Sequence, residues 1–312
     1  MIWLTWRLQR MELVLLGSVL LFMGGLLALT RDDVIALNRI YTAETCPGSL
    51  FGTEGSCVVP VSRLYSFVSS FLPWFNLLPL LAAVLLILPV LLELEQGTHR
   101  LAWTQSVTRW HWARAKLTML SLGGVAFAAL FALLFHWWSA FQDERNGRLA
   151  QDYYDLRGTI PIGATLFAIG LMVAVGMALQ RPIVATVVAS GVYVAARVVM
   201  GLWIRPHLVG SETAPNGDPS RGENYWHLSM QWRNDAGEAV SERYVTDLCF
   251  STIDVGRVAG GDCLAENGLV QFTNYHPESH YWPLQLMETG LFLVGGAALL
   301  GFAAWYVVRR VE

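Results

Sequence analysis

Charged side chains are scarce in this chain of 312 residues, since Asp, Glu, Lys and Arg together make up only 14% of it. Soluble domains usually carry about 25% charged residues. Hydrophobic residues reach 54% of the chain, and the mean hydropathy is +0.43. This balance excludes an ordinary water-soluble domain, and the sequence predicts a membrane protein.

Lysine is almost absent, because the chain has a single one, Lys116, which follows Ala115. A nucleotide-binding P-loop requires glycine before its lysine, so the chain has no P-loop. No nucleophile and base arrangement, zinc motif or dinucleotide fingerprint is evident, and we expect no catalytic site. His276 and His280, with Glu278 between them, have helical i, i+4 spacing. Pro277 interrupts a regular helix there, so we expect no metal site.

Long apolar runs, in contrast, occur six times. Each has about 18 to 25 residues, enough to cross a hydrocarbon core of about 30 Å. The first is long for a signal peptide, and no clear cleavage site follows it, so we expect it to remain as a membrane anchor. The expected fold is an all-α polytopic membrane protein, a single permease domain over residues 1–312. Its six transmembrane helices are expected near residues 11–29, 75–92, 117–138, 160–179, 183–203 and 284–308.

The distribution of charge predicts that both termini are cytoplasmic. Basic residues are concentrated in the short segments that would then lie inside, while the outer loops hold nineteen of the twenty-four acids. These outer loops are residues 30–74, 139–159 and 204–283. The inner basic residues are Arg7, Arg10, Arg100, Arg109, Arg114, Lys116, Arg181, Arg309 and Arg310.

The large loop 204–283 is predicted to be an extracytoplasmic subdomain, small β or mixed. Apolar and polar residues alternate over 227–234 and 268–276, as they do in strands. All four cysteines fall in outer loops. We therefore predict two disulfides, Cys46 with Cys57 and Cys249 with Cys263, formed in an oxidising compartment. The alternative is four unrelated thiols.

Residues 93–116 form a polar, basic and aromatic segment, ELEQGTHRLAWTQSVTRWHWARAK, between the second and third apolar runs. It contains an acidic pair, a Gly-Thr turn, a short amphipathic stretch, and Ser106 and Thr108 as candidate caps of a helix that begins near Arg109. This order is similar to the first cytoplasmic loop of ABC transporter permeases of the type-2 exporter class. Three further stretches resemble the small actinobacterial permeases of that class: YDLRGTIPIG (154–163), WIRPH (203–207) and YHPESHYWPLQLMETG (275–290).

The resemblance implies a six-span permease that works with a second permease copy or paralogue and with a separate ABC ATPase subunit. The ATPase would bind ATP and Mg, so this chain would need no cofactor of its own. By analogy, segment 93–116 is a cytoplasmic coupling loop that docks on the ATPase. The alternative is a loop that only anchors to lipids of the inner leaflet. The residues implied at the ATPase contact are Glu93, Glu95, Gly97, Thr98, Arg100, Leu101, Trp103, Gln105 and Arg109.

Only two charged residues, Arg197 and Glu288, lie well inside the expected spans. A charge in a span costs about 2.5 to 3.5 kcal/mol on insertion scales and usually faces a partner. We expect these two to pair near the outer side, although each could instead reach the outer interface alone.

Taken together, these observations predict an exporter permease of the plasma membrane that moves a hydrophobic or amphipathic drug, antibiotic, lipid or peptide. No nucleic-acid partner is expected. The alternative is a membrane sensor or immunity protein whose outer loop binds a ligand.

Overall fold

Long helices dominate the computed structural model, which describes residues 2–42, 62–97, 108–143, 147–215, 225–250 and 259–310. Within these residues, six helices are long and apolar enough to cross a membrane. They are α1 (Ile2–Thr42), α3 (Leu78–Glu95), α5 (Arg109–Ser139), α8 (Ile160–Leu179), α9 (Pro182–Val199) with its continuation, and α13 (Tyr281–Arg310). Each expected span overlaps one of them.

The helices extend beyond the apolar runs that predicted them. The first continues to Thr42, well past residue 29, and the fifth continues through the π-helix η2 (Met200–Ile204) into α10 (Arg205–Leu208). A helix satisfies its own backbone hydrogen bonds in water as well as in lipid, so loss of hydropathy does not end it. The third begins at Arg109, where the Thr108 hydroxyl accepts a hydrogen bond from the His111 N–H. Thr108 is thus the N-cap.

Helix α8 lies in the middle of the bundle, in contact with α3, α5, α9 and α13. Its small residues allow this close packing. A Cβ added at Gly170 would lie 2.7 Å from the carbonyl oxygen of Gly296 in α13, so only glycine permits the approach. A tight turn joins α8 to α9, with Gln180 in the left-handed conformation at φ 53°.

A small antiparallel sheet lies between the fifth and sixth spans. Its strands are β1 (Glu212–Pro215), β2 (Tyr225–Arg233), β3 (Ala239–Val240) and β4 (Val270–Pro277), in the order β1-β4-β2-β3. The two predicted strands correspond to β2 and β4, which pair with each other. Beyond the sheet lie α11 (Glu242–Val245), the π-helix η3 (Thr246–Phe250) and α12 (Ala259–Glu266). A disulfide joins Cys249 to Cys263. The predicted Cys46–Cys57 pair lies outside the described residues.

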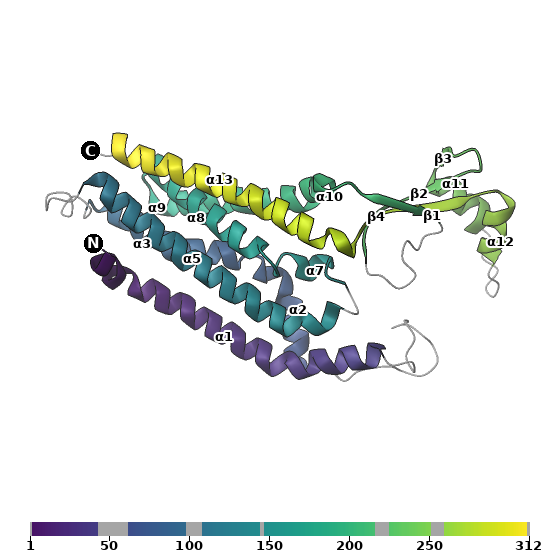
Figure 1. Ribbon diagram of the computed structural model, residues 1–312, viewed down its shortest axis with the longest axis horizontal. Helices are drawn as coiled ribbons and strands as arrows, with labels where there is room; N and C mark the ends of the chain where they lie inside the picture. The colour runs from purple at the N-terminus through teal and green to yellow at the C-terminus, as the bar shows by residue number, and fades with distance from the viewer. Residues whose placement is uncertain are drawn as a thin grey trace.

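The sheet projects from the end of the bundle opposite to the two termini, which lie together at the other end (Figure 1). Four short elements complete the described part of the chain: α2 (Arg63–Phe75) lies between α1 and α3, η1 (Ala140–Gln142) and α7 (Gln151–Tyr154) lie between α5 and α8, and η4 (Glu278–His280) joins β4 to α13. At the junction, Trp226 of β2 packs with Tyr154, Ile160, Tyr281 and Leu284 in a separate apolar core.

Candidate functional site

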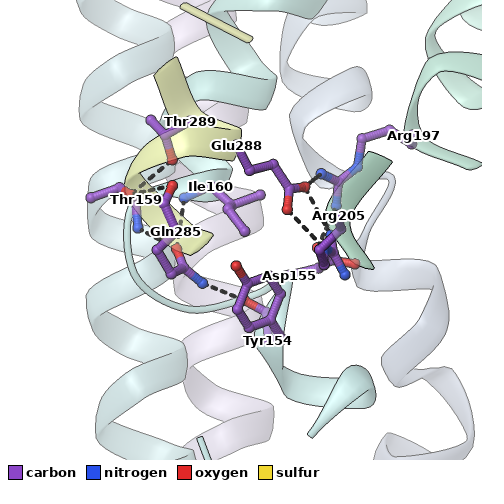
Figure 2. Close-up of polar contacts among 9 residues, drawn as sticks. All are labelled: Tyr154, Asp155, Thr159, Ile160, Arg197, Arg205, Gln285, Glu288 and Thr289. Atoms are coloured by element: carbon purple, nitrogen blue, oxygen red, sulfur yellow. Dashed lines mark hydrogen bonds and ion pairs between the residues drawn. The ribbon is translucent and has the colours of Figure 1, made fainter. Parts of the chain in front are cut away.

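Four charged side chains meet at the sheet end of the bundle. Glu288 of α13 is fully buried, and it contacts two arginines (Figure 2). Arg205 binds its carboxylate through two hydrogen bonds of 2.7 and 2.8 Å, and Arg197 lies 3.4 Å away. Asp155 pairs with Arg205 and lies 3.2 Å from Arg197. Two cations and two anions thus form a closed network, here called the charge cluster.

The π-helix η2 explains how both arginines reach the same carboxylates. In a continuous α-helix, residues eight apart would point about 80° away from each other. A π turn takes up about one residue more than an α turn, so one turn of each covers about eight residues. Arg197 lies before η2 and Arg205 follows it. The extra residue therefore places both guanidinium groups on one face.

Aromatic rings surround the charge cluster. The Arg205 guanidinium lies 4.5 Å from the centre of the Tyr154 ring, and Arg197 lies 5.5 Å from that of Phe292. The hydroxyls of Tyr154 and Tyr193 are buried, and neither has a hydrogen-bond partner among the described residues. Two buried hydroxyls without a hydrogen-bond partner beside these charges mark this as a place where polar contacts can rearrange.

Electrostatics fix the ionisation of Asp155, a cluster residue, and of its neighbour Tyr154, both of which precede α8. Burial alone would raise the pKa of Asp155, but Arg197 and Arg205 outweigh this effect and hold it below its usual range. Burial raises the pKa of Tyr154, and the Glu288 carboxylate raises it further. Asp155 is therefore ionised and Tyr154 neutral at physiological pH.

Gln285 holds the loop that carries Asp155. Its side-chain oxygen accepts hydrogen bonds from the N–H groups of Thr159 and Ile160, at 3.1 and 3.3 Å, and its amide donates to the Tyr154 carbonyl at 3.0 Å (Figure 2). Gly158 makes this approach possible: its φ is +64°, and a Cβ there would lie 2.6 Å from the same oxygen. One α13 side chain thus caps α8 and positions the cluster.

At the opposite end of the bundle, Glu93 pairs with Lys116, whose side chain is buried beside the Trp112 ring. This pair joins the end of α3 to the second turn of α5, and so it clamps the base of segment 93–116. Glu95 is exposed at the end of α3, and Gly97 follows with φ +71°. Only the backbone of Arg109 is described. The other proposed contact residues, Thr98, Arg100, Leu101, Trp103 and Gln105, lie outside the described residues.

The structure brings Arg197 and Glu288 together, as expected, but it corrects the view that they are the only charges concerned. Sequence reasoning assigned Asp155 and Arg205 to outer loops. Arg205 is instead 5% exposed, because the fifth helix continues to Leu208 and turns it inward. Glu278, considered with His276 and His280 as a metal ligand, lies 3.2 Å from Arg148.

Comparison with known families identifies the chain. The model of a family described as ABC-2 membrane transporter related matches residues 16–205, which is more than half of the chain. The protein belongs to this ABC-2 family. The resemblance to ABC-2 permeases is thereby confirmed. Neither the curated proteins nor the solved structures contain a match.

Membership of the ABC-2 family, together with six apolar helices, makes the chain a transporter permease and a multi-pass protein of the plasma membrane. A permease of this kind is the membrane component of a transport system and is not itself catalytic.

Proposed function

We propose that this ABC-2 protein is the membrane subunit of an exporter driven by a separate ABC ATPase. The family match carries the proposal. The sequence supports it further, because its single lysine cannot complete a P-loop, so energy must come from another chain. Both termini and segment 93–116 would be cytoplasmic, and the sheet would face outward. A second permease, identical or a paralogue, would complete the path.

Coupling would run from segment 93–116 into the bundle. The buried pair of Glu93 and Lys116 makes the ends of this segment move together with α3 and α5. Closure of the ATPases around ATP would displace the segment and tilt both helices. Because packed helices move as rigid bodies, α8 would follow through its contacts with both.

The charge cluster would act as a latch at the outward end. It joins three elements that must separate or slide if a path opens there: the loop before α8, the fifth span with α10, and α13. A latch of this kind would need a second arrangement of similar energy, in which these discrete contacts are exchanged for others. The cargo would be hydrophobic or amphipathic.

The test is affinity purification of the tagged protein from its native membrane in mild detergent, followed by mass spectrometry. We expect a Walker-motif ATPase to be recovered with the wild type and lost with a Gly97→Pro, Arg100→Glu variant. An Arg181→Glu variant is the matched control, because it reverses a charge in the other short inner turn and should retain the ATPase. If no ATPase is recovered with any of the three, the exporter proposal fails, and the sensor or immunity alternative takes its place.

A further inference from the structure

A cavity of about 470 Å³ lies where the fifth span meets the sheet. One wall is formed by Gly201 and Leu202 of the π-helix and by the start of α10. The facing wall is formed by β2, from Trp226 to Ser229. The cavity therefore touches the same helical turn that aligns the two arginines of the charge cluster, but it contains none of the cluster's side chains.

The polar groups of this cavity can donate or accept hydrogen bonds. Among the described residues that line it, none is Asp, Glu, Lys or Arg; the polar ones are Gln151, His207, Ser211, His227, Ser229 and Asn274, and all of these but Asn274 are exposed. A charged group placed there would therefore gain no counter-charge from a carboxylate, a lysine or an arginine. A hydroxyl or amide, in contrast, could exchange hydrogen bonds with water for hydrogen bonds with the protein at little cost.

Several of these groups remain available to a ligand. His207 Nδ1 lies 2.7 Å from the Trp203 carbonyl and donates to it, which leaves Nε2 as an acceptor. The Ser229 hydroxyl accepts from Asn274 at 3.0 Å and keeps its own proton to donate. The side chains of Gln151 and His227 make no hydrogen bond within the described part of the chain. Donors and acceptors are therefore interspersed, as a polyol requires.

An apolar track leads from the bilayer to the cavity. Val194, Val198 and Leu202 follow one another at four-residue spacing along the fifth span, and all three are exposed. The candidate span ends at Leu208, beside the cavity, and we therefore place the cavity at the depth of the headgroups. A tail on this track would place its head between the π-helix and the sheet.

We propose that this cavity binds the uncharged, hydroxyl-bearing head of an amphiphile whose tail lies along Val194, Val198 and Leu202. The assignment of this amphiphile as cargo rests on the proposed function, whereas its binding does not. A head in contact with Gly201 and Leu202 touches the turn that sets the position of Arg205. Occupancy would thus act on the latch through this turn.

The test is native mass spectrometry of the purified protein in an oligo(ethylene glycol) detergent that carries no sugar. The probes are a monoglucosyl diacylglycerol and a phosphatidylglycerol with the same acyl chains. We expect the glucosyl lipid to bind about tenfold more tightly than the anionic lipid. Gly201→Leu, which fills the cavity, and His227→Leu, which removes a polar group from the sheet wall, should each abolish this preference.

Gly191→Leu is the matched control, because a Cβ at either Gly191 or Gly201 meets open space, but only Gly201 lines the cavity. This variant should retain the preference. Equal binding of the two lipids by the wild type would overturn the proposal, and so would an unchanged preference in His227→Leu, which lies outside the membrane part. The binding measurement needs no ATPase. Equal binding of the two lipids would therefore say nothing against an ATPase partner, and absence of an ATPase from the purification would say nothing against lipid binding.

Discussion

At the scale of single residues, Glu288 is the side chain on which the charge cluster most depends. It has no exposed surface, and it binds both arginines. A buried ion pair contributes little net stability when intact, but removal of one partner leaves an uncompensated charge in an apolar environment. The loss of stability should therefore be large when Glu288 is replaced, and small when one partner of an exposed ion pair at the sheet end of the bundle is replaced.

We predict that Glu288→Gln lowers the free energy of unfolding by about 3 kcal/mol or more, measured by thermal melting in detergent. The control, Glu278→Gln, breaks a half-exposed pair with Arg148 and should cost about 0 to 1 kcal/mol. Combining Arg197→Glu with Glu288→Arg should recover part of the loss. A double variant no more stable than Arg197→Glu alone would argue against a direct interaction.

His276 gives the junction of bundle and sheet a dependence on pH. It is fully buried, with Nε2 3.2 Å from the Pro206 carbonyl and Nδ1 3.1 Å from His280. Burial lowers its pKa, and His280 lowers it further against the opposing effects of Pro206 and Glu212. The folded state thus binds fewer protons than the unfolded state near pH 6.

The contribution of neutral His276 to stability should therefore be fully present above about pH 6.5, the usual pKa of histidine. It should be lost as the pH is lowered through the depressed pKa of His276. Melting temperatures measured between pH 7.5 and 5 should show this fall in the wild type and a flatter profile in His276→Gln. His136→Gln, a change at an exposed histidine, should melt like the wild type at every pH. An unaltered profile in His276→Gln would mean that another group titrates.

Two of the four cluster residues were predictable from sequence because they interrupt apolar runs. Arg197 and Glu288 stand out there, and the cost of a lone charge in lipid implies a partner. Asp155 lies among polar residues, and Arg205 lies just past the end of the fifth apolar run, and in neither place does a charge need an explanation. Their burial arises from tertiary contacts and from the hydrogen-bonding pattern of one turn, which composition does not record.

At the scale of elements, the charge cluster depends most on the π-helix η2, because this turn sets the position of Arg205 relative to Arg197. Insertion of one alanine after Leu202 should place Arg205 nine residues after Arg197 and rotate it by about 100° away from the carboxylates. We expect a loss of stability close to that of Glu288→Gln, and little further loss when Glu288→Gln is added to the insertion, because both changes break the same network.

Insertion of one alanine after Gly210, which lies in the connection after α10, is the control for lengthening the chain, and it should leave the cluster intact. Thermal melting of the wild type, the two insertion variants, Glu288→Gln and the double variant decides the matter. Fully additive losses for the insertion after Leu202 and Glu288→Gln would show that the π turn does not position Arg205.

Helices and strands were predictable to different degrees for physical reasons. Apolar runs located the six long helices, because a helix in the membrane is apolar on all sides. Alternation of apolar and polar residues located β2 and β4, because a strand with one buried face has this pattern. The short strands β1 and β3 have no such signature, since they depend on pairing with β4 and β2. Helix ends beyond Leu29 and Trp203 were missed because hydropathy reports lipid contact rather than helical structure.

At the scale of the whole molecule, orientation is the prediction that underlies the rest. In a variant with Cys46→Ser and Cys57→Ser, an impermeant maleimide should label Cys249 and Cys263 in intact cells once their disulfide is reduced. A cysteine introduced by Arg181→Cys, in a chain whose other cysteines are replaced by serine, should react only after the membrane is permeabilised. The reverse pattern would invert the proposed topology and remove segment 93–116 from the cytoplasm.

The pairing of β1 with β4 has a consequence for how the outer part of such a permease can change. Glu212 lies opposite Tyr275 in this ladder, so the chain leaves the fifth span and returns to the sixth at nearly one point. The distance that the connection must cover is set there, and everything beyond it is a cassette attached through β1, β4 and β2, which pair side by side at this level. Beyond the contact of Trp226 at the junction, that cassette can be lengthened, shortened or exchanged without altering how the membrane helices meet. In the proposed topology this cassette faces the surroundings, so the outer part is free to diverge while the membrane helices stay the same.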